Sequence, residues 1–358
     1  MKKYDKIDLT KKDLIHLLSI KDEKELESVR QMAENTLLNN CGNKVYYRGL
    51  IEFSNECASD CHYCGIRASN TKINHYRLSL GEIVESAAWC AQQGYGSVVL
   101  QSGERQDRAF VDFVESAVRA IKEATISPKL PSGLGITLCV GEQTAEVYRR
   151  FFEAGSHRYL LRIETTNPKM FARCHPSRQL FNDRVAALRR LKQVGFQVGT
   201  GVMIGLPGHT IEDLANDLLF FKTMDVDMIG MGPYIVHNDT PMATWPDVFD
   251  RTPQERLGLA LRMIAAARLL LKDVNIAATT ALQAIDPIGR EQGLRFGANI
   301  IMPQLTPQGV RKEYLLYEGK PCLDESAQQC KGCLEMRIAS ADRKIGYDEW
   351  GDSKHFHR

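Results

Sequence analysis

The sequence has 358 residues, of which 44% are hydrophobic and 25% charged, as in a globular protein with a full core. Its formal net charge is only +2, which gives no electrostatic argument for a nucleic-acid partner or an acidic membrane surface. No apolar run approaches the length of a membrane span, and the N-terminus lacks the apolar centre of a signal peptide. We therefore expect no nucleic-acid partner, no membrane partner and a cytoplasmic location.

The predicted elements begin with a helical N-terminal extension over residues 1–43, which opens with a short amphipathic helix. After it, short apolar runs alternate with longer amphipathic segments. The apolar runs are typical of buried parallel strands and lie at 46–53, 97–102, 135–140, 158–164, 196–205, 227–234, 275–280 and 299–303. Helical periodicity, often with start and stop signals, covers 79–96, 107–124, 183–196, 210–226 and 252–272.

The spacing of these runs, about 32 residues per repeat, is that of a strand–helix unit. Eight such units predict an α/β fold, a (β/α)8 TIM-type barrel over residues 44–304, with an open doubly wound sheet as the alternative. Residues 125–134 are expected to form a surface insertion, and residues 305–358 a C-terminal extension on the barrel. In such a barrel, chemistry gathers where the strands end.

Ten cysteines are many for a reducing compartment, where clustered cysteines usually bind metal or act in catalysis. Cys57, Cys61 and Cys64 have the spacing C-x3-C-x2-C, directly after the first predicted strand. A structural zinc site needs a fourth protein ligand, and none follows at a usual spacing. Three thiolates suit a 4Fe–4S cluster with one iron free of cysteine. A zinc site with a distant ligand and a chance cluster stay open.

The other cysteines fall into two groups. Cys41, Cys90, Cys139 and Cys174 are isolated, and we predict that they are small buried side chains. Three more lie near the C-terminus with the spacing C-x7-C-x2-C, namely Cys322, Cys330 and Cys333.

The first cysteine motif, with Tyr63 before its last cysteine, resembles that of the radical S-adenosylmethionine (SAM) superfamily. The resemblance implies a 4Fe–4S cluster whose open iron is chelated by the amino and carboxylate groups of SAM. One electron from the cluster then cleaves SAM to methionine and a 5′-deoxyadenosyl radical. The protein positions the reactants and excludes water, while the cofactor carries the difficult step.

The resemblance also assigns SAM contacts at successive strand ends. The stretch "QSGE" resembles a Gly-Gly-Glu-type motif that contacts the methionine amino group, with serine in place of the first glycine. Glu164 resembles the carboxylate that accepts from the ribose hydroxyls, and Arg184 a two-pronged donor to the SAM carboxylate. The stretch "GLPG" would let the backbone approach the adenine. The cofactor-binding candidates are Tyr63, Gln101, Ser102, Gly103, Glu104, Glu164, Arg184, Gly205, Leu206 and Pro207.

Further stretches resemble the HydE family of FeFe-hydrogenase maturases over about residues 45–335. They include "IEFSNECASDCHYCGIR", "RYLLRIETTNP", "DMIGMGPYIVHNDTP", "GANIIMPQLTP" and "YLLYEGKPC". This resemblance implies a role in building the two-iron subcluster, with radical attack on the sulfur of a cysteine-bound iron dicarbonyl cyanide complex. It also implies the maturases HydG and HydF as partners and an electron donor such as ferredoxin or flavodoxin.

The same resemblance places six residues around the substrate, namely Thr137, Arg162, Thr279, Thr280, Met302 and Tyr317. An arginine suits an anionic carboxylate or cyanide, and threonine hydroxyls can donate to either. Ordinary barrel filling is the alternative for the threonine pair and the methionine. Ile163 stands where a relative of the family may carry histidine, so it adds no polar group there.

The second cysteine set is present in some members of the family, so it resembles an auxiliary iron–sulfur site of the 2Fe–2S or 4Fe–4S type. A zinc site or free thiols are the alternatives. For the whole chain, the competing functions are a radical SAM enzyme of the methylornithine synthase or biotin synthase kind and a non-catalytic iron–sulfur scaffold. The ordered SAM motifs argue against the scaffold.

Overall fold

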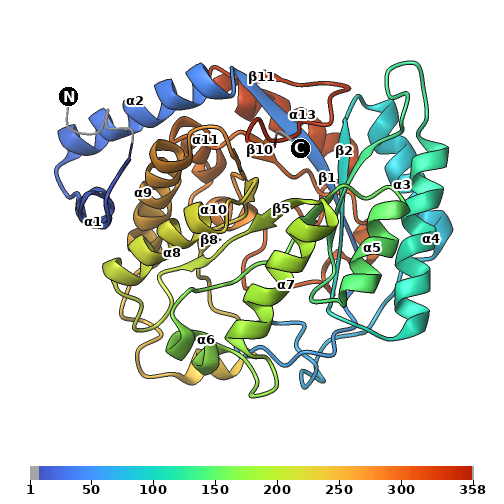
Figure 1. The fold of residues 1–358 in the computed structure, drawn as a ribbon, viewed down its shortest axis with the longest axis horizontal. Helices are drawn as coiled ribbons and strands as arrows, with labels where there is room; N and C mark the ends of the chain where they lie inside the picture. The colour runs from blue at the N-terminus through green and yellow to red at the C-terminus, as the bar shows by residue number, and fades with distance from the viewer. Residues whose placement is uncertain (1–7, 357–358) are drawn as a thin grey trace.

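The computed structural model describes residues 8–356, and the chain within this range forms a closed barrel with flanking helices (Figure 1). Helices α1 (Lys11–Ser19) and α2 (Glu23–Asn40) precede the first strand. Thr10 and Asp13 form a capping box that starts α1, because each side chain satisfies a backbone N–H of the other. The predicted N-terminal helix is therefore present, although residues 1–7 of its segment lie outside the described residues.

Eight parallel strands form the barrel, and each pairs with its neighbour in the order given by the chain. A parallel bridge between Ala277 and Ile300 joins the last two strands and completes the ring. The predicted (β/α)8 barrel is confirmed, and the open doubly wound sheet is not the fold. The strands are β1 (Lys44–Ser54), β2 (Ser97–Ser102), β3 (Gly135–Cys139), β4 (Arg158–Leu160), β5 (Gln197–Thr200), β7 (Met228–Ile229), β9 (Asn275–Ile276) and β10 (Ile300–Ile301).

Two predicted strands are each interrupted by glycine. The run 196–205 divides into β5 and β6 (Met203–Ile204), and the run 227–234 into β7 and β8 (Gly232–Pro233). Gly201 and Gly230 lie at the two breaks, and a Cβ on Gly201 would lie 2.0 Å from the Gly230 carbonyl oxygen. The two backbones thus approach more closely than side chains allow. Strands β6 and β8 pair separately, towards the end of the barrel where the strands have their carboxyl ends, which we call the mouth.

Two other strands end earlier than the sequence predicts. The run 158–164 is regular only to Leu160, and the run 275–280 only to Ile276, since Thr280 already begins helix α10 (Thr280–Ile285). In both places the backbone leaves the sheet at the mouth, where the candidate site residues lie.

Helices cover the outside of the barrel, and in Figure 1 α6 lies at the bottom and β11 (Lys344–Ile345) at the top. Most of the long helices begin at a Ser, Thr or Asp whose side chain accepts from the first turn. The helices are α3 (Leu80–Gln92), α4 (Arg108–Ala124), α5 (Ala145–Glu153), α6 (Pro168–Cys174), α7 (Phe181–Val194), α8 (Ile211–Thr223), α9 (Pro253–Leu271), α11 (Gly289–Arg295), α12 (Gln308–Arg311) and α13 (Ala327–Ser340), with the 3-10 helix η1 (Pro241–Thr244).

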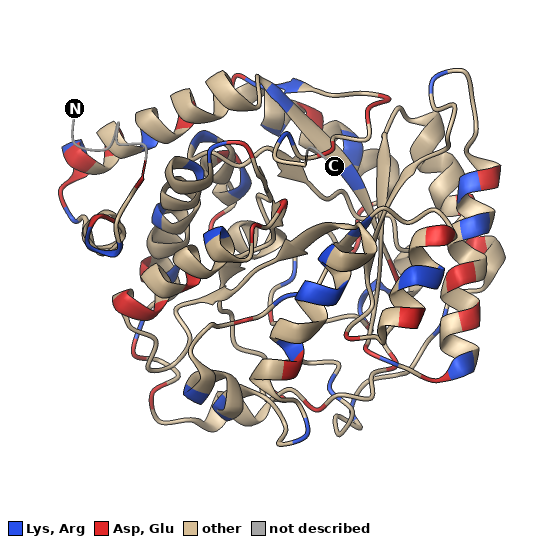
Figure 2. Cartoon of the chain, viewed as in Figure 1, with Lys and Arg blue, Asp and Glu red and all other residues tan. Residues whose placement is uncertain are grey.

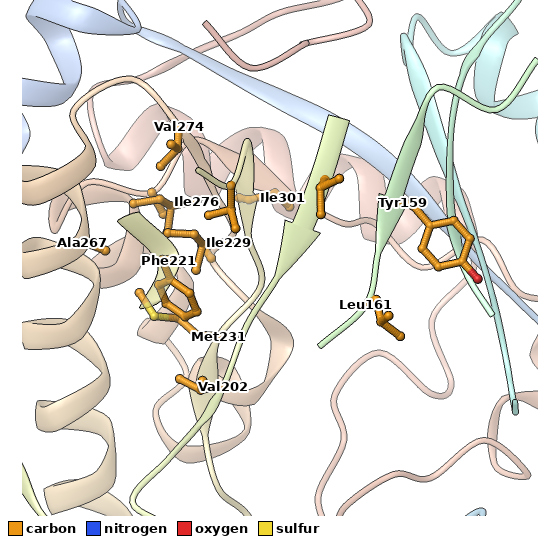
Figure 3. Close-up of a cluster of buried hydrophobic side chains, with 14 of the residues drawn as sticks. Tyr159, Leu161, Val202, Phe221, Ile229, Met231, Ala267, Val274, Ile276 and Ile301 are labelled. Atoms are coloured by element: carbon orange, nitrogen blue, oxygen red, sulfur yellow. The ribbon is translucent and has the colours of Figure 1, made fainter. Parts of the chain in front are cut away.

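The core lies between the strands and the surrounding helices. Figure 3 shows Phe221 of α8 and Ala267 of α9 beside Ile229 and Ile276 of the strands. Charged side chains of both signs are dispersed over the helices, while the strands carry few (Figure 2). Across residues 8–356, no helix combines the length and apolarity that crossing a bilayer requires.

The C-terminal segment closes the base of the barrel, opposite the mouth. Strand β11 pairs with the start of β1, and Asp352 then meets Arg158 of β4 with an N–O distance of 2.7 Å. Arg158 is fully buried and also donates to Ser97, to Thr137 and to the Trp350 carbonyl. Since a buried charge is tolerated only when it is paired, this segment stabilises the base.

Candidate functional site

The loop that follows β1 carries Cys57, Cys61 and Cys64 and lies against the end of β2. The Cys57 sulfur accepts from the backbone N–H groups of Ser59 and Glu104, at 3.4 and 3.3 Å. A Cβ on Gly103 would lie 2.3 Å from the Glu56 carbonyl oxygen, so only glycine permits this approach. The predicted placement of the cysteine loop at the mouth is confirmed, and the "QSGE" stretch is its direct neighbour.

The arrangement of the three thiols fits a multi-iron cluster better than a single ion. Sulfur ligands of one zinc ion lie roughly 3.8 Å apart, as Zn–S bonds of about 2.3 Å in a tetrahedron require. The three sulfurs of this loop are not all within 4.8 Å of one another. Among the described residues, the ligand atoms of Cys322, Glu325 and Cys330 are that close together. Burial raises the pKa of the Cys61 thiol to about 12, so thiolates here require bound metal, which deprotonates a coordinating thiol.

Tyr63 is held beside the cysteines by His175 at the end of α6. The two side chains are 3.1 Å apart, and His175 Nδ1 lies 2.8 Å from the Phe171 carbonyl oxygen. Burial lowers the pKa of His175 to about 3, so the ring is neutral. The neutral ring donates a hydrogen bond from Nδ1 to the Phe171 carbonyl, so Nε2 accepts a hydrogen bond from the Tyr63 hydroxyl. This chain of contacts fixes the Tyr63 ring.

Arg184 of α7 lies between two carboxylates at the mouth. Its Nε donates to Glu142, and its Nη2 is 3.8 Å from Glu104 Oε2. Burial raises the pKa of Glu104 despite the opposing effect of the guanidinium. A third contact, from Arg184 Nη1 to the Arg162 carbonyl at 2.6 Å, ties α7 to the segment after β4. The guanidinium is therefore fixed in orientation and adjoins the "QSGE" stretch.

Glu164 has a strained backbone and an incompletely satisfied carboxylate. Its φ is +64°, in the left-handed region that side chains other than glycine rarely adopt. The Arg162 guanidinium lies 2.9 Å from Glu164 Oε2 but outside hydrogen-bonding geometry, and this buried oxygen has no hydrogen-bond donor. Burial raises the pKa of the carboxyl. The oxygen is thus paired with the Arg162 charge but accepts no well-aligned hydrogen bond, and it can accept one from a bound molecule.

The loop of Gly205, Leu206 and Pro207 leads from β6 to α8 over an apolar cluster. Gly205 has a φ of +78°, and its carbonyl accepts from Arg256 of α9 at 3.1 Å. The Leu206 side chain is buried, and Tyr63 packs against the same cluster, which also contains Met170, Cys174, Met203, Tyr234, Met242 and Val248. The glycine loop and the cysteine loop thus pack against a common buried apolar cluster.

The residues predicted to contact substrate fall into separate groups. Thr137 and Met302 line one internal cavity of about 30 Å³, room for roughly one water. Thr280 and Tyr317 share a 2.8 Å hydrogen bond. Arg162 faces Glu164, and Thr279 donates to the Met231 carbonyl at 3.3 Å.

Thr137 lies in the middle of β3, which continues to Cys139, and its hydroxyl accepts from Arg158 at the base. One sequence prediction about the end of this strand is wrong. Cys139 is not fully buried as Cys41, Cys90 and Cys174 are. It ends β3 within electrostatic range of Arg162, and burial among these groups raises its thiol pKa to about 12. Thr137 and Cys139 share one face of β3, because side chains alternate along a strand.

The second cysteine region is only partly assembled. Cys322 and Cys330 lie with Glu325 so that their ligand atoms are within 4.8 Å of one another. The Cys333 sulfur instead accepts from Arg337 Nε at 3.2 Å. The structure therefore brings together two of the three predicted cysteines, with a carboxylate that the sequence analysis did not select.

Several residues of the site had no signal recognised in the sequence. Glu142, which holds Arg184, follows the end of β3, so its place after a strand could have marked it. Gln179 accepts from the Cys61 thiol at 3.4 Å and lies in a loop without a motif. A buried ion pair of 2.5 Å joins Glu52 to Lys320 and attaches the C-terminal extension beneath the site.

The fold and this mouth define a class of protein, the radical SAM enzymes: the Radical SAM superfamily matches residues 51–221. The FeFe-hydrogenase maturase subunit HydE of Thermotoga maritima is 41% identical over 99% of this chain and 97% of its own length. The chain belongs to the HydE family of radical SAM maturases. Membership implies a 4Fe–4S cluster and SAM as cofactors.

Two further relatives share most of the chain. The 3-methylornithine synthase of Methanosarcina barkeri is 29% identical over 84% of this chain and 80% of its own length. A crystal structure of methylornithine synthase superimposes with a TM-score of 0.78 at 25% identity and covers 96% of both chains. The barrel is thus shared with enzymes of another activity. The higher sequence identity, 41% with HydE against 29% with the methylornithine synthase, places the chain in the HydE family.

Proposed function

We propose that this chain acts in assembly of the two-iron subcluster of FeFe-hydrogenase, with a cysteine-bound iron dicarbonyl cyanide complex as substrate and its sulfur as the reacting atom. The observation that carries the SAM part is the buried Glu164 carboxylate, which is paired with Arg162 but accepts no well-aligned hydrogen bond at Oε2, within electrostatic range of Cys64. When bound, the cluster supplies an electron to SAM and so yields the 5′-deoxyadenosyl radical. The identity with the Thermotoga protein supports the maturase part.

The residues of this chain have distinct parts in the proposal. Cys57, Cys61 and Cys64 hold the cluster and leave one iron open to SAM. Glu164 accepts from the ribose hydroxyls. Arg184, whose Nε and Nη1 are held by Glu142 and the Arg162 carbonyl, has Nη2 left to donate to the SAM carboxylate. Together they fix the position of the sulfonium relative to the cluster and limit water at the mouth.

Tyr63, Gln101, Ser102, Gly103 and Glu104 border the methionine end of SAM in this proposal. Gly205, Leu206 and Pro207 border the adenine. For the substrate, Arg162 pairs with its anionic groups, and the hydroxyls of the barrel interior orient them. This second set consists of Thr137, Thr279, Thr280, Tyr317 and, as an apolar neighbour, Met302.

We further propose that Cys322, Cys330 and Cys333 form an auxiliary iron–sulfur site that the radical step does not need. Arg290 supports an anionic group there, because it is buried and two of its guanidinium nitrogens, Nε and Nη1, have no partner. Arg290 also acts electrostatically on Cys322 and Cys330. HydG is the proposed source of the iron complex, HydF the next partner, and ferredoxin or flavodoxin the electron donor.

The test is anaerobic reconstitution with iron and sulfide, followed by dithionite and SAM. We expect 5′-deoxyadenosine to form and the EPR signal of the cluster to change when SAM binds. Absence of both results would contradict any radical SAM activity. Deletion of the gene in a host with FeFe-hydrogenase should leave that enzyme without its two-iron subcluster, whereas a methylornithine or biotin synthase would leave it intact.

A further inference from the structure

Helix α8 has a titratable carboxyl group in its interior-facing row. Asp217 is fully buried, and its Oδ1 accepts from Thr166 twice, from the backbone N–H at 2.8 Å and from the hydroxyl at 2.6 Å. Its Oδ2 has no hydrogen bond, and the nearest basic group is His209 Nε2 at 3.6 Å. Burial raises the pKa of Asp217 to about 7, against the opposing effect of the hydrogen bonds from Thr166. A buried carboxyl group is unfavourable unless its hydrogen bonds are kept, so its two contacts with Thr166 mark a defined structural role.

Thr166 lies two residues after Glu164, in the segment where the chain leaves β4. The left-handed backbone of Glu164 is unfavourable for a residue other than glycine and persists only if its surroundings enforce it. On one side, Glu164 donates to the Gly201 carbonyl at 3.0 Å and accepts from Met203 at the same distance. On the other side, the Asp217 contacts with Thr166 hold the turn. The direction of the Glu164 side chain depends on both.

The start of α8 contacts the second loop of the proposed SAM site as well. Asp213 forms a capping box with Thr210, directly after the glycine loop, and accepts from Asn167 at 2.9 Å. Thus the first two turns of α8, roughly seven residues, join the segment after β4 to the loop before the helix. The charged and titratable groups that face Asp217 here are His209, Asp213 and, next to His209, Arg251.

We propose that Asp217 is a positioning residue for SAM, which acts by fixing the turn that directs the Glu164 carboxylate. The inference rests on the proposed contact between Glu164 and the ribose. Asp217 touches neither SAM nor substrate, so its loss should weaken SAM binding through misdirection of Glu164 and leave the chemical step little changed at saturation. A neutral amide suffices for this role, because the carbonyl oxygen of asparagine accepts the same two bonds.

The experiment compares Asp217→Leu and Asp217→Asn in the reconstituted full-length protein. We expect Asp217→Leu to raise the KM for SAM in 5′-deoxyadenosine formation about tenfold or more, with kcat within about threefold. Asp217→Asn should restore KM to within about twofold of the wild type. Equilibrium binding of SAM to the reconstituted protein should follow KM.

A control variant separates positioning from general stability. Thr125→Val, like Asp217→Leu, removes a buried acceptor of a backbone N–H, here that of Leu134 at 2.9 Å, and it acts at the opposite end of β3 from the mouth. We expect it to lower the thermal midpoint and leave the KM for SAM unchanged. Thr166→Val, which loses only one hydroxyl, provides a milder variant and should raise KM about threefold.

The decisive readout is the coupling to Glu164. In a Glu164→Ala background, Asp217→Leu and Thr166→Val should raise KM no further, because the group they direct is absent. If Glu164→Ala weakens SAM binding but the Asp217 effect persists in full alongside it, positioning through Glu164 is wrong. If Glu164→Ala leaves SAM binding unchanged, the ribose contact itself is wrong, and this inference fails with it.

Discussion

The two cysteine-bearing regions of the molecule, the mouth and the C-terminal region, are alike in one respect and differ in another. Both regions hold strained backbone and buried groups without hydrogen bonds: Glu164 at the mouth, and Cys322, with a φ of +66°, and Arg290 in the C-terminal region. Such features gather at functional sites, because binding later satisfies them. The regions differ in how far their thiols are assembled. Cys57, Cys61 and Cys64 lie on one loop, whereas the Cys333 sulfur accepts from Arg337 instead of joining Cys322 and Cys330. The comparison supports the proposed SAM site at the mouth and makes the C-terminal site the secondary one.

The largest expected effect tests the mouth side of this comparison. Cys61→Ala should reduce SAM cleavage below detection, because a cluster held by two thiolates is not retained. Iron content and 5′-deoxyadenosine formation after reconstitution provide the measurement. Cys90→Ala is the control, since Cys90 is fully buried away from the loop and should leave both unchanged. Cleavage in the Cys61 variant would refute the assignment of the cluster.

Arg184→Gln should have the next largest effect. It leaves Glu142 and Glu104 without their cation, and breaking a buried pair costs about 3–5 kcal/mol. We expect a lower thermal midpoint and a KM for SAM raised at least tenfold. Arg184→Lys should fall between this variant and the wild type, because a single ammonium cannot replace the fork. An unchanged KM in both variants would show that Arg184 serves stability alone.

Cys330→Ala tests the other side of the comparison. This thiol lies with Cys322 and Glu325 in the C-terminal region. We expect any iron bound there to be lost, while the rate of SAM cleavage stays within about twofold of the wild type. Iron analysis together with 5′-deoxyadenosine formation measures both. Loss of SAM cleavage with an intact first cluster would make the second region part of the catalytic machinery.

The smallest expected effect concerns the pH dependence of stability. Hydrogen bonds to Asp273 and Asp225 raise the pKa of His355 from 6.5 to about 9. Because the folded-state pKa is the higher one, the stabilisation is complete below about pH 6.5 and is lost as pH rises through about 9. After solvent screening we expect roughly 1–2 kcal/mol, measured by urea unfolding at both ends of this range.

His355→Gln is the matched variant for this prediction, because glutamine keeps a hydrogen-bonding group and cannot carry a charge. It should remove this part of the pH dependence and leave the KM for SAM unchanged. An equal loss of stability with pH in the variant and the wild type would assign the effect to other groups. A changed KM would mean that the base and the mouth are coupled.

Much of the barrel and the cysteine loop followed from the sequence alone. Buried parallel strands are recognisable because both faces are apolar, and Cys57, Cys61 and Cys64 are close in the chain, so their proximity needs no tertiary information. Glu104 and Glu164 could likewise be matched to successive strand ends, whereas Arg184 lies in helix α7.

Only the tertiary structure decided which distant groups meet. Glu142 with Arg184, Asp352 with Arg158, and Asp217 with Thr166 are pairs separated by 42, 194 and 51 residues. The breaks at Gly201 and Gly230 also depend on the approach of two backbones. Local patterns report which face of a strand or helix is buried, because that depends on periodicity. Side-chain partners depend on the closure of the ring, which brings the ends of all strands to one mouth.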